Sequence, residues 1–145
     1  MTIQLTEHFA LRELTFSSAA VRLGIDNMPP LPVIANLTVA AMGLERVRKL
    51  LNAPISVDSG YRCPELNTAI GGSATSAHMT GFAVDFVCPQ FGTPLDVARA
   101  IRDSDLQFDQ LIYEGAWVHI SFDPKMRGEV LTAHFNRPTS YTKGL

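Results

Sequence analysis

The chain has 145 residues, of which 46% are hydrophobic and 18% charged, and its formal net charge is −2 at pH 7. This composition indicates a folded protein with its own hydrophobic core rather than a disordered chain. The basic residues are scattered and no apolar stretch approaches the roughly 20 residues of a membrane span, which argues against nucleic-acid-binding and membrane-spanning proteins.

The first half of the chain is predicted to be mainly helical. "TEHFALRELTFSSAAVRLGID" indicates two short helices that are separated near residues 15–18. The strongest helix is predicted within residues 28–54, because prolines are tolerated in a first turn, apolar residues then recur every three or four positions, and Pro54 ends the pattern. A short strand over 55–58 and a short helix in "PELNTAIGG" follow.

The second half is predicted to be rich in strands. "GFAVDFV" indicates one strand, and "FDQLIYE" and "WVHISF" indicate a hairpin joined by Gly115–Ala116. Between them, "TPLDVARAIRDSD" indicates a helix with Thr93 as its N-cap and Asp96 at its third position. "GEVLTAHF" adds a further strand, and a polar, loosely held tail ends the chain. The expected fold class is α+β, with N-terminal helices packed on a mostly antiparallel sheet.

Alternation in these strands separates an apolar face from a polar face. Successive side chains of a strand point to opposite sides of the sheet, so the apolar residues of each strand predict its buried face. The opposite faces carry four polar residues, namely Asp85, His119, Gln110 and Glu114. If the strands share one sheet, these polar faces converge on a single site.

Two histidines and one aspartate in this region suit a metal. Two imidazoles and a carboxylate are a ligand set for zinc that leaves one position open for water. Asp85 and His119 lie on predicted strands, and His78 lies on the loop before the first of them. Taken alone, Asp85 or His119 on such a face would more often be an ordinary solvated or hydrogen-bonded side chain. No HExxH motif is present, and His8 and His134 are interpreted as structural.

The start of the chain and its two cysteines bear on the compartment. "MTIQLTEHFALRELTF" lacks a cationic segment followed by an apolar one, so no signal peptide is predicted and synthesis in the cytoplasm is expected. Any action outside the cell would then need a separate means of release. Cys63 and Cys88 are not in a CxxC pair, which disfavours a cysteine metal site, and a disulfide between them stays open.

Three local motifs, taken in order, carry a resemblance to a known family. They are "SGYRCPELN", "SAHMTGFAVDF" and "WVHISF". Together they resemble the zinc D-Ala-D-Ala carboxypeptidases and L-Ala-D-Glu endopeptidases, which share their fold with the Hedgehog signalling domain, and in particular the compact phage-type members. The family pattern SxHxxGxAxD is met by residues 76–85, its second histidine by His119, and its SxxR element by residues 59–62. The resemblance covers roughly residues 30–123.

This resemblance implies roles for individual residues. Zinc would be held by His78, Asp85 and His119, and the substrate would be the stem peptides of peptidoglycan, cut near D-amino acids. Arg62 would bind a substrate carboxylate or stabilise the oxyanion, or else tie its loop to the sheet as a structural residue. Three residues are candidates for contact with substrate. Ser76 could instead hydrogen-bond within its loop, and Trp117 and Tyr61 could instead cover the edge of the sheet.

The general base is where the sequence departs from the family pattern. Many relatives carry an acidic residue three positions before the second histidine, and this chain has Ala116 there. Glu114, at the end of the preceding strand and on the polar face, is the expected base. Asp109 is the alternative, although it lies at the far end of that strand and has the opposite parity.

The expected function is that of a zinc metallopeptidase acting on peptidoglycan, as an endolysin or virion-associated lytic enzyme. A D-Ala-D-Ala carboxypeptidase and a catalytically inactive, zinc-stabilised module are the alternatives, the latter because of Ala116. Residues 1–145 are expected to form one domain, with 1–29 as a helical extension and 136–145 as the tail. The expected partners are peptidoglycan peptides, with no nucleic acid and no membrane, and the chain is expected to be a monomer.

Overall fold

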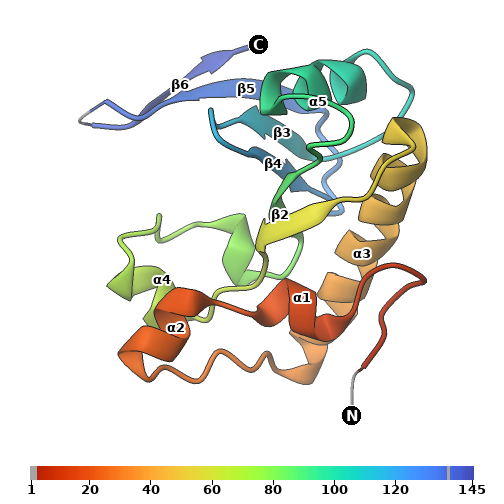
Figure 1. The fold of residues 1–145 in the computed structure, drawn as a ribbon. Coiled ribbons are helices and arrows are strands. Elements are labelled where there is room, and N and C mark those ends of the chain that lie inside the picture. Colours follow the sequence, from red (N-terminus) through yellow and green to blue (C-terminus); the bar gives the residue numbers. More distant parts are fainter. Residues whose placement is uncertain (1–2, 137) are drawn as a thin grey trace.

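A computed structural model describes residues 3–136 and 138–145 (Figure 1). Its helices are α1 (Leu11–Thr15), α2 (Ser18–Leu23), α3 (Leu31–Leu51), α4 (Pro64–Ala69), α5 (Pro94–Arg102) and a single 3-10 turn, η1 (Ala77–Met79). Its strands are β1 (Ser56–Ser59), β2 (Ala83–Val87), β3 (Gln110–Tyr113), β4 (Val118–Ser121), β5 (Glu129–His134) and β6 (Ser140–Lys143).

The six strands form one sheet in the order β1-β2-β4-β3-β5-β6. Every neighbouring pair is antiparallel except β3 and β5, which run parallel. Figure 1 shows α1, α2 and α4 gathered at one end of the molecule and the β5–β6 pair at the other. The predicted α+β class with a mostly antiparallel sheet is confirmed.

One face of the sheet is covered by helices. The buried side of α3 carries apolar residues at three- and four-residue spacing, so these side chains share one face of the helix; they are Leu37, Ala41, Leu44 and Val47. They join apolar side chains of α5 and of the central strands in one core. A capping box between Thr93 and Asp96 begins α5, as predicted. In the described part of the chain, the helices are all too short or too polar to cross a membrane.

The opposite face of the sheet presents the polar residues predicted from alternation. Antiparallel pairing sets Asp85 of β2 directly beside His119 of β4, and His119 in turn beside Ile112 of β3. Val84 and Ile120, which flank this row, point into the core and are fully buried. The two strands therefore bring a carboxylate and an imidazole together across neighbouring positions.

Three features of the sheet differ from the sequence predictions, and the structure also answers whether the two cysteines form a disulfide. The connection between β3 and β4 spans residues 114–117, twice the predicted length. The pairing of β5 with β3 is parallel, an arrangement that the sequence pattern did not indicate. The expected loose tail contains β6, which pairs with β5 over four residues. Cys63 and Cys88 are both free thiols.

We expect Gly60→Ala to destabilise the fold. A Cβ atom at this position would lie 2.3 Å from the carbonyl oxygen of Leu14, because the neighbouring Tyr61 N–H donates to that same oxygen over 2.7 Å. Backbone on both sides must shift, so the free energy of unfolding should fall by about 3 kcal/mol, the upper end of the range for over-packed sites. Urea denaturation measures this change.

Gly71→Ala is the matched control for that measurement. Gly71 has a φ of +75° and nothing within 4 Å of its hypothetical Cβ, so only the conformational cost of about 1 kcal/mol applies. Equal losses of stability in the two variants would contradict a steric role for Gly60.

Candidate metal centre

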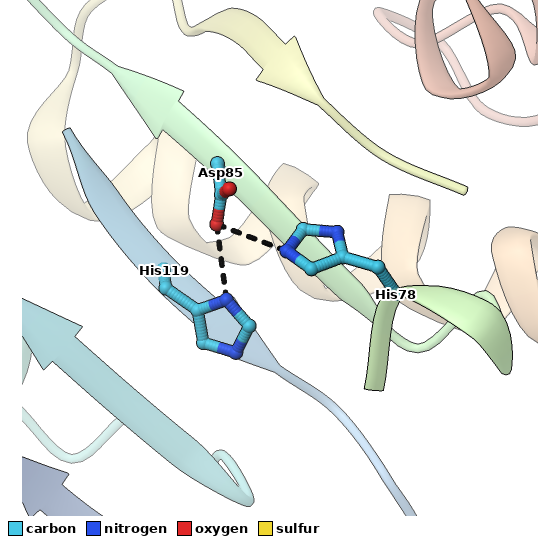
Figure 2. Close-up of side chains that lie close together, drawn as sticks. All are labelled: His78, Asp85 and His119. Carbon is cyan, nitrogen blue, oxygen red and sulfur yellow. Dashed lines mark hydrogen bonds and ion pairs between the residues drawn. The ribbon is translucent and has the colours of Figure 1, made fainter. Parts of the chain in front are cut away.

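His78, Asp85 and His119 meet on the open face of the sheet (Figure 2). Asp85 comes from β2, His119 from β4 and His78 from η1. Asp85 Oδ1 lies 3.2 Å from His78 Nε2 and 3.0 Å from His119 Nδ1. One potential ligand atom from each residue lies within 4.8 Å of the others, and all three residues are buried. This cluster could hold one metal ion.

The loop before β2 fixes the orientation of His78. Ser76 caps η1 by accepting the backbone N–H of His78 with its Oγ. The ring nitrogen Nδ1 of His78 lies 2.7 Å from the carbonyl oxygen of Gly60. Gly81 then turns the chain into β2 with a φ of +87°, a conformation that favours glycine. The ring is thereby held with Nε2 directed at Asp85.

This orientation suits the Nε2 atom of His78 to binding a metal ion. A carbonyl oxygen only accepts hydrogen bonds, so Nδ1 of His78 must carry a proton. Burial lowers the pKa of this histidine, which favours the neutral ring. In that tautomer Nε2 presents a lone pair, which faces the carboxylate oxygen of Asp85 at 3.2 Å. Two acceptors at this distance repel each other, and a cation bound between them removes the repulsion.

The surroundings of Asp85 and His119 also suit these residues to metal binding. Although burial acts to raise it, the pKa of Asp85 is held well below its ordinary range by the hydrogen bond with His119, so the carboxylate is ionised. Nε2 of His119 is buried without a hydrogen-bond partner among the described residues. Nδ1 of His119 instead donates to Asp85 Oδ1 over 3.0 Å, so a cation bound at the cluster would take the place of the proton between these two atoms.

A cleft of about 940 Å³ surrounds the cluster. The loop between α4 and η1 contributes one wall, through Ser73, Thr75 and Ser76. Residues from the β5–β6 region contribute the opposite wall, and these are Leu131, Phe135, Thr139 and Tyr141. Apart from the cluster itself, four of the predicted site residues line the cleft, namely Arg62, Ser76, Glu114 and Trp117. The volume matches that of sites for small molecules or short peptides.

Glu114 lies in the first position of the β3–β4 connection. Its Oε2 accepts a hydrogen bond from the indole Nε1 of Trp117, and its backbone N–H donates to the carbonyl oxygen of Trp117 over 3.1 Å. Burial raises the pKa of the Glu114 carboxyl, and the negative charge of Asp85 adds to this rise. A carboxylate with a raised pKa in a metal-binding cleft is suited to accept a proton.

Arg62 lies in the same cleft. Its Nη2 donates to Ser76 Oγ over 3.1 Å, and its Nε is buried without a partner among the residues that the structure describes. Burial lowers the pKa of Arg62, whereas the carboxylates of Asp85 and Glu114 oppose this. An arginine in such a position remains charged and has donors to offer to a bound anion. Ser76 connects this arginine to the loop that carries His78.

Two residues that the sequence analysis considered for the site, Tyr61 and Asp109, are not placed for the roles considered there. Tyr61 is 4% exposed and its side chain belongs to the hydrophobic core, away from the residues that line the cleft, because its backbone is drawn against α1. Asp109 does line the cleft, but its carboxylate accepts two hydrogen bonds from Arg127 at 2.9 Å. These bonds lower the pKa of Asp109, which makes it a poor proton acceptor.

Two parts of the site were missed in the sequence. The carbonyl of Gly60, which orients His78, belongs to the backbone and left no side-chain signal. The wall from β5–β6 was missed because the strand predicted in "GEVLTAHF" was not assigned to the site and residues 136–145 were interpreted as a loose tail. Two aromatic residues were the available signal, Phe135 at the end of that strand and Tyr141 within the polar tail.

The site consists of a buried cluster of two histidines and an aspartate, with a glutamate and an arginine in the same cleft. This arrangement is typical of metal-dependent hydrolases. A family model described as Peptidase M15 matches residues 7–121, well over half of the chain, and the protein therefore belongs to this family. It is a zinc metallopeptidase. A comparison with curated proteins found no match.

The cluster satisfies the requirements of zinc. Two nitrogen donors and one oxygen donor are a frequent protein ligand set for catalytic zinc, with one further position left for water or substrate. Bonds of about 2.0–2.1 Å in a tetrahedron place neighbouring ligand atoms about 3.3–3.4 Å apart. The carboxylate–imidazole separations of 3.0 and 3.2 Å are close to this spacing. The hydrogen bond from His78 Nδ1 to a backbone carbonyl is also typical of metal-bound histidines.

Proposed function

We propose that this zinc peptidase hydrolyses peptide bonds in the stem peptides of peptidoglycan, near D-amino acids. The observation that carries this proposal is that one cleft contains the metal-binding cluster together with Glu114 and Arg62. A proton acceptor and a fixed positive charge beside a metal are the groups that hydrolysis of a peptide with free carboxylates requires. In this proposal residues 1–145 act as a single domain.

The proposed roles follow from the positions of the side chains. His78, Asp85 and His119 would hold zinc, which when bound polarises the scissile carbonyl and lowers the pKa of water. Glu114 takes a proton at Oε1 from the water that attacks the carbonyl carbon, since Oε2 is occupied by the indole N–H of Trp117. It then gives that proton to the amine that leaves when the C–N bond breaks. Arg62 donates to a carboxylate of the substrate or to the developing negative charge on the carbonyl oxygen.

The extent of the cleft favours an endopeptidase over a carboxypeptidase. In one direction along the sheet it continues past the cluster to Asp109 and Gln110 at the start of β3, and in the other to Glu114 and Trp117. A substrate chain can therefore extend on both sides of the reacting bond. We further propose that the enzyme is of the phage lytic type, made in the cytoplasm and reaching the wall after release or as part of a virion.

We expect the protein loaded with one zinc ion to cleave defined stem peptides and to lose this activity on treatment with a chelator. Mass analysis of the fragments identifies the bond. Cleavage between L-Ala and D-Glu would support the endopeptidase, whereas release of a single terminal D-Ala would make the enzyme a carboxypeptidase. Failure to cut any stem peptide with one zinc bound per chain would contradict the proposed substrate.

A further inference from the structure

Trp117 and Phe135 form a contact beside Glu114 that the proposed reaction does not yet use. The ring centroids of Trp117 and Phe135 are 6.1 Å apart, with their planes inclined by 44°. Phe135 follows β5 and is 58% exposed, whereas Trp117 is only partly exposed. Phe135 lies beyond the residues matched by the Peptidase M15 model, which end at 121. The matched region of the family therefore does not explain why a large, exposed aromatic residue lies in the cleft wall.

Trp117 also contacts Glu114 directly. Its indole N–H donates to Oε2 of Glu114, and its carbonyl oxygen accepts the backbone N–H of the same residue. Gly115, with a φ of +82°, lets the intervening chain turn back on itself so that the two residues meet. Both the main chain and the side chain of Glu114 are thus held by one tryptophan.

We propose that Trp117 and Phe135 are positioning residues, which hold the Glu114 carboxylate in the orientation needed for proton transfer. Phe135 packs against the indole ring, the ring in turn fixes the direction of its N–H, and that N–H fixes one oxygen of Glu114. Oε1 is then presented to the reacting groups. The C-terminal segment acts on the reaction through this contact. The inference rests on the proposed role of Glu114 as the base.

The alternative is that both aromatic residues merely pack or contact substrate. A carboxylate at the end of a strand and on a four-residue connection has rotamer freedom, and a displacement of about 1 Å at a reacting group can cost about 100-fold in rate. Loss of a positioning residue should therefore lower kcat. Loss of a substrate contact should instead raise KM, and loss of packing alone should lower the melting temperature without affecting the rate at permissive temperature.

The test uses the zinc-loaded protein and a stem peptide that the wild type cleaves. Trp117→Phe keeps an aromatic ring but removes the N–H, and kcat should fall about tenfold or more, with KM and zinc content unchanged. Phe135→Ala should lower kcat in the same way, and Phe135→Tyr should restore it. Phe16→Ala is the matched control, since Phe16 is 59% exposed and lies outside the cleft, and it should leave kcat unchanged.

Combined variants separate this inference from the proposed function. Phe135→Ala should cause no further loss of kcat when Trp117→Phe or Glu114→Gln is already present, because all three act through one carboxylate. Additive losses, a change confined to KM, or wild-type kcat in Trp117→Phe would overturn the positioning role. Failure of the wild type to cleave, or full activity of Glu114→Gln, would instead overturn the proposed function or its base.

Discussion

Glu114→Gln should lower kcat by about 10²–10⁴-fold while the protein still binds one zinc ion, because general-base catalysis contributes about this factor. Glutamine has nearly the same shape as glutamate, and its amide oxygen can still accept the indole N–H of Trp117. It cannot take up a proton under these conditions. Steady-state kinetics on a stem peptide, together with metal analysis of the same sample, measures both quantities.

Glu129→Gln provides the matched control for this variant. Glu129 begins β5, and its Oε1 accepts a hydrogen bond from Gln110 over 2.7 Å. It is outside the residues that line the cleft, so its substitution should leave kcat near the wild-type value. If Glu114→Gln proved as active as this control, another group would have to be the base.

The pH dependence of kcat should report the same carboxyl group. Glu114 can accept a proton only when it is ionised, and burial raises its pKa above the ordinary 4.5. Activity should therefore be present at neutral pH and be lost as the pH falls through this raised pKa, at a higher pH than for an exposed glutamate. An acid limb at or below 4.5 would show that Glu114 does not control the rate.

His119→Ala should abolish stoichiometric zinc binding, and peptidase activity with it. Two donors, His78 and Asp85, would remain, and a catalytic zinc site ordinarily uses three protein ligands. Loss of a partner that only supports a ligand already costs about 10–100-fold in metal affinity, so the loss of a ligand should exceed this. Elemental analysis after dialysis and a hydrolysis assay measure the two effects.

His134→Ala is the control for a general effect of removing a histidine from the sheet. His134 lies in β5, its Nε2 is hydrogen-bonded to Thr142, and it does not line the cleft. This variant should keep one zinc ion per chain. Retention of a full equivalent of zinc in His119→Ala would remove this residue from the ligand set.

The convergence of Asp85 and His119 was predictable because it depends on alternation alone. Residues at every second position of β2 and β4 are apolar and fully buried, so the face that carries the two polar residues was determined by the core. The short helices, α3 and the capped start of α5 were predictable for a similar reason, since proline positions, apolar spacing and capping residues are local signals.

The remaining features depend on contacts between distant parts of the chain. The parallel pairing of β5 with β3 and the addition of β6 leave no signature in a short stretch of sequence, and β6 itself is exposed along its whole length. The burial of Tyr61 follows from the close approach of its backbone to α1, which depends on Gly60 having no side chain. The sequence pattern could therefore identify an aromatic residue such as Tyr61, but it could not show whether that residue lies in the core or in the cleft.

The distribution of the metal-binding cluster over the fold bears on how the centre is assembled. Asp85 and His119 are neighbours in the paired middle of the sheet, whereas His78 is carried by a single helical turn between two loops. Strand pairing therefore holds two of the three ligand residues side by side, and the third is supplied by the one segment that enters from outside the sheet. A substitution in that segment can displace one ligand and leave the spacing of the other two intact.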